Sequence, residues 1–248
     1  EDRTRPAAPT LHEGGLINFI IEPGLTASMR KTMAGTGTTL FIFLLAIYYI
    51  LLSKYSGRED IVIGSPVSGR RHDDLHDIIG LFINMLSLRN QPRGEKTFRE
   101  FLEEVKKNAL DAYENQDYQF DELVGKLGLQ GENRNPLFQV VFAAVDTETH
   151  PGENPGPTIE RYTYERFIPK YDLRLAVTEQ TESIFLSLQY SKTLFNESTV
   201  RKMTERYVEI LAQVIENREI PLKEISLTHR LLVAKSQTIE EYRETFEF

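Results

Sequence analysis

The chain has 248 residues, 40% of them hydrophobic and 27% charged, and a formal net charge of −8. This length can bury a substantial core, as one large domain or two small ones. The acidic balance argues against a nucleic-acid-binding protein, and the absence of cysteine excludes disulfides and thiolate metal sites.

The first third of the chain contains the most apolar segment. Residues 1–14 are rich in proline, threonine and charge, which predicts a linker and not a secretory signal. A strand over 16–21 and a short helix over 25–34 follow. Residues 38–53, TTLFIFLLAIYYILLS, then predict a core helix. Their solid apolar run, 40–52, is shorter than the ~20 residues that a bilayer needs.

Residues 59–89 carry the most specific pattern. They predict a short strand over 61–64, a polar loop over 65–71, an acidic bend, and a second strand over 81–88. Two strands that each carry a polar loop at one end suggest a sheet edge where a ligand could bind.

An amphipathic helix is predicted over 97–113, where Thr97 and Glu100 form a capping box. A short helix over 121–127 and a buried strand over 137–145 follow. The inward face of the long helix is expected to contain Phe98, Phe101, Leu102, Val105, Ala109, Leu110 and Tyr113.

The last third predicts strands over 158–167, 173–178 and 184–190, and the last two should form an antiparallel hairpin. Asn196 is expected to cap a long amphipathic helix over 198–216. The chain should then leave the domain over 220–227 and end in a loosely attached charged helix over 228–248. The mixed order of strands and helices predicts an α/β fold with a mixed β-sheet flanked by helices.

Two partial motifs in the central stretch have simple structural explanations. The loop 64–71, GSPVSGRR, has the glycine spacing of a P-loop, but arginines stand where the lysine and the Ser/Thr should be. A tight turn, with Arg70 or Arg71 bound to a carboxylate, is favoured over a nucleotide site. His72 and His76 have a zinc-like spacing, but no third ligand is evident, so a solvated acidic bend is favoured. No complete catalytic constellation is visible.

Three segments together resemble the condensation domains of nonribosomal peptide synthetases. IIGLFINMLSLR at 78–89 resembles the motif (I/V)-G-x-F-(V/I)-N-T-x-x-x-R, and ENQDYQFDEL at 114–123 resembles (H/N)-Q-D-x-P-F-E. ENRNPLFQVVF at 132–142 is similar to R-D-x-S-R-N-P-L-F. Among the departures, Met85 replaces the usual threonine, which removes a hydroxyl near the presumed substrate tunnel. The resemblance runs from about Asp2 to Ile225.

The resemblance implies a chloramphenicol-acetyltransferase-like lobe. The family's H-H-x-x-x-D-G motif lies in its N-terminal lobe, and this sequence contains no adjacent histidines. The implied organisation is therefore an inter-lobe linker at 1–14, a C-terminal lobe at 15–226 and a linker toward a following domain at 227–248. No catalytic residue and no metal are expected in this lobe.

The implied reaction is amide-bond formation between aminoacyl or peptidyl thioesters, which carrier proteins deliver on 4′-phosphopantetheine in the cytoplasm. No cofactor is expected to bind this lobe directly. The implied partners are carrier proteins, the N-terminal lobe of the same domain and a neighbouring adenylation domain, with no nucleic acid and no membrane. Alone, the lobe should be inactive.

The resemblance suggests two groups of residues for this lobe. Roles in the substrate tunnel or in positioning are assigned to Ser65, Ser68, Arg70, Gly80 and Asn84. Structural roles, in which side chains hold loops by bonding to the backbone, are favoured for Asn115, Gln116, Asp117, Arg134 and Asn135.

Two alternatives remain open from the sequence. One is a non-catalytic module that docks carrier proteins or a neighbouring domain. The other, a free-standing acyltransferase, is disfavoured because the lobe lacks a histidine general base. If the other lobe is absent, the surface facing it should be exposed, and an apolar patch there would favour self-association.

Overall fold

A computed structural model of the chain describes residues 1–6, 13–70, 72–75, 77–129, 135–145 and 168–227. The predicted strand at 158–167, the terminal helix at 228–248, and Arg134 and His76 lie outside these residues. The strands are β1 (Gly14–Ile21), β2 (Ile61–Val67), β3 (Asn84–Asn90), β4 (Val140–Ala144), β5 (Leu173–Glu179) and β6 (Ile184–Ser191). The helices are α1 (Pro23–Ala34), α2 (Leu40–Ser56), α3 (Phe98–Glu114), α4 (Phe120–Lys126) and α5 (Glu197–Glu216), with 3-10 turns η1 (Asp73–Leu75) and η2 (Leu222–Glu224).

One mixed sheet of six strands organises the fold, in the order β1-β6-β5-β4-β2-β3. The two central pairs, β5 with β4 and β4 with β2, are parallel, and the other neighbours are antiparallel. The α/β class with a mixed sheet is confirmed. The predicted hairpin of the last two strands is also confirmed, with Leu173 opposite Tyr190.

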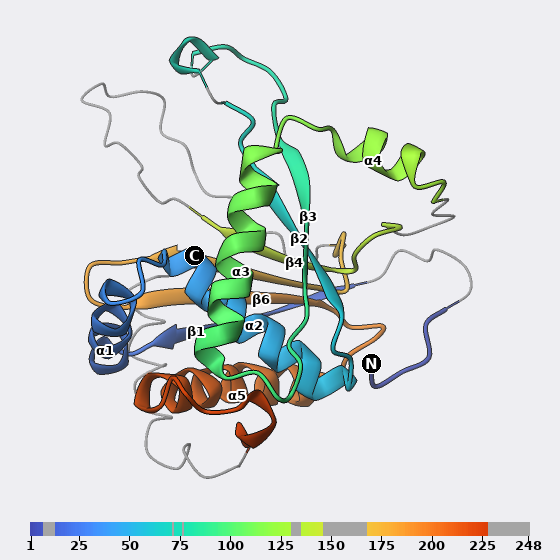
Figure 1. Ribbon diagram of the computed structural model, residues 1–248. Helices are drawn as coiled ribbons and strands as arrows, with labels where there is room; N and C mark the ends of the chain where they lie inside the picture. Colours follow the sequence, from blue (N-terminus) through green and yellow to red (C-terminus); the bar gives the residue numbers. More distant parts are fainter. Residues whose placement is uncertain (7–12, 71, 76, 130–134, 146–167, 228–248) are drawn as a thin grey trace, which may run out of the picture.

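Helices α2, α3 and α5 cover one face of the sheet (Figure 1). Strand residues alternate between the faces, so this face receives Leu173, Leu175 and Val177 of β5, which are all buried. The intervening residues, including Gly64, Val141 and Arg174, belong to the opposite face, which we call the second face.

Helix α2 is the buried centre of the core, as its composition predicts. The hydroxyl of Thr39 caps its first turn by accepting from the backbone of Ile42, and Gly57 ends it with φ 67°, a left-handed conformation that favours glycine. Tyr48 and Tyr49 are fully buried, and the hydroxyl of Tyr49 donates to the carbonyl of Leu88 on β3 at 2.6 Å. Among the described residues, no helix is both long and apolar enough to cross a bilayer.

The central stretch differs from its predicted boundaries. The predicted loop 65–71 begins too early, because β2 continues through Pro66 to Val67, opposite Asn84. The predicted strand 81–88 is shifted, since pairing starts only at Asn84 and Leu81 is 87% exposed. The alternation of FINMLSL predicts a strand that includes Phe82 and Ile83, but these two residues pair with no strand among the described residues.

The other boundaries differ by less. The buried strand predicted over 137–145 begins only at Val140, because the side chain of Asn135 holds the preceding residues in a turn. The capping box of Thr97 and Glu100 is confirmed on α3. The prediction that Leu110 lies on the inward face of α3 is wrong, since this side chain is 49% exposed. Asn196 occupies the N-cap position of α5, but its side chain makes no capping bond and instead accepts from Arg3.

Both described ends of the chain pack on the body. The backbone N–H of Asn196 donates to Asp2, and Arg5 forms an ion pair with Asp172, so residues 1–6 are anchored near the start of β5. The prediction that 220–227 leaves the domain is wrong for its first part, since Leu222 and Ile225 are 2% exposed and belong to the core.

Candidate functional site

The connection between β2 and β3 projects from the body of the molecule (Figure 1, top). We call residues 68–83, apart from 71 and 76, the arm. Its glycine at 69 has φ +66°, and a Cβ there would lie 2.0 Å from the carbonyl oxygen of Phe82. The two ends of the arm therefore approach each other so closely that only glycine fits at position 69.

Arg70 organises the arm from its base. Its guanidinium donates to the carbonyls of Leu75 and of Ile78, the latter at 2.8 Å, and lies 4.4 Å from the ring centroid of Phe82. A more distant contact, 3.5 Å, reaches the carbonyl of Gly80. The planar guanidinium thus fills a set of carbonyl acceptors that would otherwise depend on water.

The other predicted tunnel residues of this region are Ser65, Ser68 and Gly80, and Ser65 lies apart from the other two. Ser65 is 1% exposed, faces the helix-covered side of β2, and has no hydrogen bond to its hydroxyl among the described residues. Ser68 is exposed, and its hydroxyl accepts from the backbone of Arg70 at 3.4 Å. Gly80 is exposed on the arm. The structure therefore brings Ser68, Arg70 and Gly80 together on the arm and leaves Ser65 in the core.

The returning half of the arm, residues 78–83, exposes large apolar side chains, and we call it the apolar segment of the arm. Ile79 is fully exposed, Leu81 is 87% exposed, Ile83 60% and Ile78 48%. Single exposed apolar residues are ordinary, but a contiguous group of this kind marks an interaction surface.

Asn84 connects the base of the arm to the segment between α3 and α4. Its Nδ2 donates to the carbonyls of Gln116 at 2.8 Å and Tyr118 at 2.9 Å. Its Oδ1 accepts from the backbone of Met85 at 2.9 Å and of Phe120 at 3.1 Å. Every hydrogen-bonding position of this amide is occupied by backbone, and the side chain is buried. Asn84 therefore joins the second and the first of the resemblance motifs physically.

Three of the five predicted structural residues bond to nearby backbone. Asn115 donates to the carbonyl of Asp111, Gln116 donates to that of Tyr113, and Asn135 accepts from Leu137 and Phe138. These contacts are of the local kind expected for side chains beside helix ends.

An aromatic row on the second face was not predicted. Phe138 lies 5.5 Å from Phe120 and 6.1 Å from Tyr171, centroid to centroid, and its ring covers Gly64. A Cβ on Gly64 would lie 2.1 Å from this ring. The only signal in the sequence is a glycine inside a strand, which often marks a close approach.

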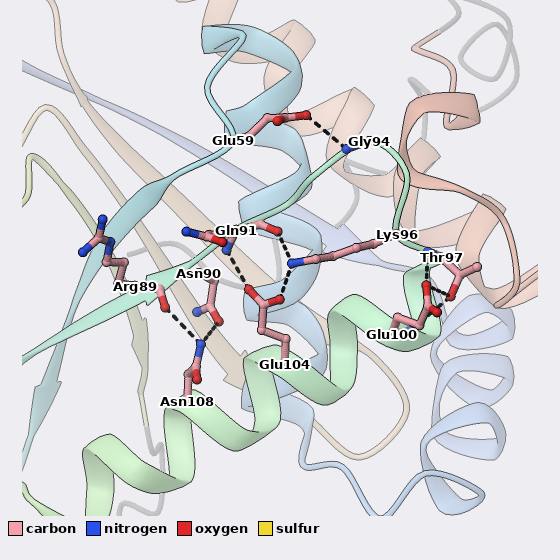
Figure 2. Close-up of polar contacts among 10 residues, drawn as sticks. All are labelled: Glu59, Arg89, Asn90, Gln91, Gly94, Lys96, Thr97, Glu100, Glu104 and Asn108. Carbon is pink, nitrogen blue, oxygen red and sulfur yellow. Dashed lines mark hydrogen bonds and ion pairs between the residues drawn. The ribbon is translucent and has the colours of Figure 1, made fainter.

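A polar cluster lies at the far end of β3 from the arm (Figure 2). Glu104 on α3 accepts from the backbone of Gln91 at 2.8 Å and forms an ion pair with Lys96, and Asn108 donates to the carbonyl of Arg89. These contacts tie the end of β3 to the flank of α3. Because Glu104 pairs with Lys96 and Arg89 pairs with Asp60, the arrangement is suited to stability and not to binding a ligand.

The two partial motifs, a nucleotide-binding loop at 64–71 and a zinc site at His72 and His76, gain no support from the described residues. The strand before the glycine-rich loop is followed by the short turn η1 and not by a helix N-terminus that could hold phosphate. His72 is exposed, and the described residues contain no group of three potential metal ligands.

The family model "Condensation domain" matches residues 1–232. Over 227 residues the chain is 48% identical to Tyrocidine synthase 3 of Brevibacillus parabrevis, covering 91% of this chain and 4% of that protein. Over 255 residues it is 39% identical to Tyrocidine synthase 2 of the same organism, covering 98% of this chain and 7% of that protein. The chain thus spans less than a tenth of these relatives.

Solved structures share the fold. The X-domain in its complex with OxyB from teicoplanin biosynthesis superposes with a TM-score of 0.82 at 25% identity, covering 92% of this chain and 50% of that chain. The condensation domain of the monacolin K polyketide synthase MokA gives a TM-score of 0.75 at 22% identity, covering 90% and 52%. The family match and the synthetase relatives agree with the three motifs, and the chain belongs to the condensation-domain family.

Proposed function

We propose that this chain is the C-terminal lobe of a condensation domain in a cytoplasmic nonribosomal peptide synthetase. The family match over residues 1–232 carries the proposal. It is supported by the solved neighbours, of which this chain covers 50% and 52%. The sequence has no adjacent histidines, so we expect the active-site histidines to come from an N-terminal lobe.

The proposed reaction joins two substrates that carrier proteins hold on phosphopantetheine. The amine nitrogen of the acceptor attacks the carbonyl carbon of the donor thioester, and the C–N bond forms as the C–S bond breaks. The amine proton passes through a base to the departing thiolate, which is released as the thiol. Holding two tethered reactants together supplies much of the rate, and the base supplies the proton transfer. This lobe would contribute one wall and no catalytic group.

Within that wall we propose indirect roles for most of the named residues. Arg70 and Gly80 would act by shaping the arm, and Asn84 by fixing its base against the segment before α4. These roles are supported by the contacts of Arg70 and Asn84 with backbone carbonyls. Ser68, exposed at the base of the arm, is the residue that we assign to direct contact with a tethered substrate or with the other lobe.

The test uses one carrier protein loaded with a donor aminoacyl group and a second loaded with an acceptor. Both are incubated with this chain alone, and with this chain plus a separately expressed N-terminal lobe, and the dipeptidyl product is followed by mass spectrometry. We expect product only when both lobes are present. Product from this chain alone would contradict the assignment of the base to the other lobe.

A docking module without catalytic duty is the second candidate, and the exposed apolar segment of the arm, 78–83, favours it. Its signature in the same experiment is carrier binding without product in either mixture. We further propose that the apolar segment of the arm drives self-association of the isolated chain, since it exposes Ile79 and Leu81.

A further inference from the structure

Arg174 occupies an unusual place for a cation, the second position of a central strand. It lies on β5, paired with Val141 of β4 on one side and with Gln189 of β6 on the other. Its neighbours along the strand, Leu173 and Leu175, point into the helix-covered core, so Arg174 belongs to the second face. Its side chain is half-buried.

Among the described residues, no carboxylate pairs with this guanidinium, and the Arg174 side chain makes no hydrogen bond and no ion pair there. The acidic residue closest in sequence on the same face, Asp172, has both its oxygens taken by Arg5, one of them at 3.0 Å. A half-buried cation without a partner costs free energy that a matching anion would recover.

The groups around Arg174 leave its N–H donors open to a ligand, and among the described residues they include no carboxylate that competes for them. The next row of the same face consists of Ala143, Ala176 and Ser187, which have short side chains. On the other side stands Tyr171, the end of the aromatic row; burial raises the pKa of its hydroxyl, and the charge of Arg174 opposes that rise. Ala143 and Ala176 are themselves buried, so the half-buried Arg174 lies between covered small residues and the aromatic row.

We propose that Arg174 binds an oxyanion, a phosphate or a carboxylate, that a substrate brings to the second face. Five N–H donors in a planar fork suit both groups. The binding of an oxyanion does not depend on the proposed function. Only the identity of the molecule that carries this oxyanion rests on it. The oxyanion would be either the phosphate of the pantetheine arm or an acidic side chain on the tethered amino acid.

The first test needs no catalysis. In the 248-residue chain labelled with ¹⁵N-arginine, the Nε–H signal of Arg174 is identified by its loss in Arg174→Gln, and inorganic phosphate is titrated in. We expect a saturable shift of this signal and none for the exposed Arg58, which is the control. A shift that is equally weak and unsaturated at both arginines would identify a solvated surface arginine and overturn the proposal.

The second test identifies the source, with both lobes present and the product followed as above. Substrates are compared in two matched pairs, phosphopantetheine with pantetheine thioesters and aspartyl with asparaginyl groups. Arg174→Gln should reduce turnover about tenfold for the anionic member of one pair only, and Arg174→Lys should restore part of it. Equal turnover by Arg174→Gln and the parent on all four substrates would overturn both candidate sources. Absence of product with the parent protein, together with saturable phosphate binding, would reject the proposed function and leave the oxyanion site standing.

Discussion

Asn84 shows how one side chain can hold two distant segments together. Its amide bonds with the backbone of residues 32 to 36 positions away, between α3 and α4. Its donors and acceptors are used in different directions, since Nδ2 faces carbonyls and Oδ1 faces N–H groups. A substitution that preserves shape and removes only the donors therefore tests this role directly.

Asn84→Asp keeps the acceptor oxygen but turns a second oxygen toward the carbonyls of Gln116 and Tyr118. We expect the free energy of unfolding to fall by about 2–4 kcal/mol, because a buried carboxylate would face acceptors without a donor. Urea denaturation measures the change. Asn115→Asp is the control, since Asn115 is exposed and should change stability by less than about 0.5 kcal/mol. Equal losses in the two variants would contradict the role of Asn84.

Gly64 is expected to be intolerant of any side chain. Gly64→Ala would place a Cβ 2.1 Å from the ring of Phe138, so the ring must move and the aromatic row must open. We expect a loss of about 1–3 kcal/mol from this overpacking. Gly125→Ala on α4 is the matched control, since no atom lies within 4 Å of its Cβ position, and it should stabilise by up to about 1 kcal/mol. Thermal and urea unfolding of both variants would settle the comparison.

At the scale of elements, α2 couples the core to pH through its tyrosines. Burial raises the pKa of Tyr48 and Tyr49, and of Tyr207 on α5, well above the ordinary 10.0. These hydroxyls stay protonated in the folded chain after they have ionised in the unfolded chain. The stability they confer is complete below pH 10 and is lost as the pH rises toward their folded pKa values.

We therefore expect the free energy of unfolding to decline steeply between about pH 10 and 11. The fall should be smaller in Tyr48→Phe, which removes one of these groups. Absorbance of tyrosinate should rise together with unfolding and not before it. A tyrosinate signal equal to that of all 11 tyrosines while the chain is still folded would exclude the burial described for α2.

The arm is an element shaped by one side chain. Arg70→Gln should accelerate amide hydrogen exchange in residues 77–83, because the guanidinium that binds the carbonyls of Leu75 and Ile78 is lost. The free energy of global unfolding should change by less than about 0.5 kcal/mol, since the arm lies outside the core. Unchanged exchange in the arm would show that its shape does not depend on Arg70.

At the scale of the whole molecule, the exposed apolar segment of the arm predicts a concentration-dependent association. Sedimentation velocity of the isolated chain should show a dimer or larger species at high concentration. Replacing Ile79 and Leu81 together with aspartate should remove it, whereas Leu110→Asp, at an exposed site on α3, should not. A strictly monomeric parent chain at every concentration would contradict the proposed self-association.

The sequence by itself determined the elements with strong local signals and the family. The composition of 40–52 identified α2, the capping box identified the start of α3, and the three motifs indicated the condensation-domain fold. These features depend on side-chain periodicity, on residues three or four apart, or on several motifs in order, and all can be read along the chain.

Only the tertiary structure decided where β3 begins, which partners Asn84 has and why Gly64 cannot be replaced. Each depends on contacts between residues far apart in sequence: strand pairing with Val67, the carbonyls beyond α3, and the ring of Phe138. The same holds for Arg174, which looks like any strand residue until Arg5 is found to occupy the neighbouring carboxylate. Local propensity does not encode such pairings, because they arise only when the sheet assembles.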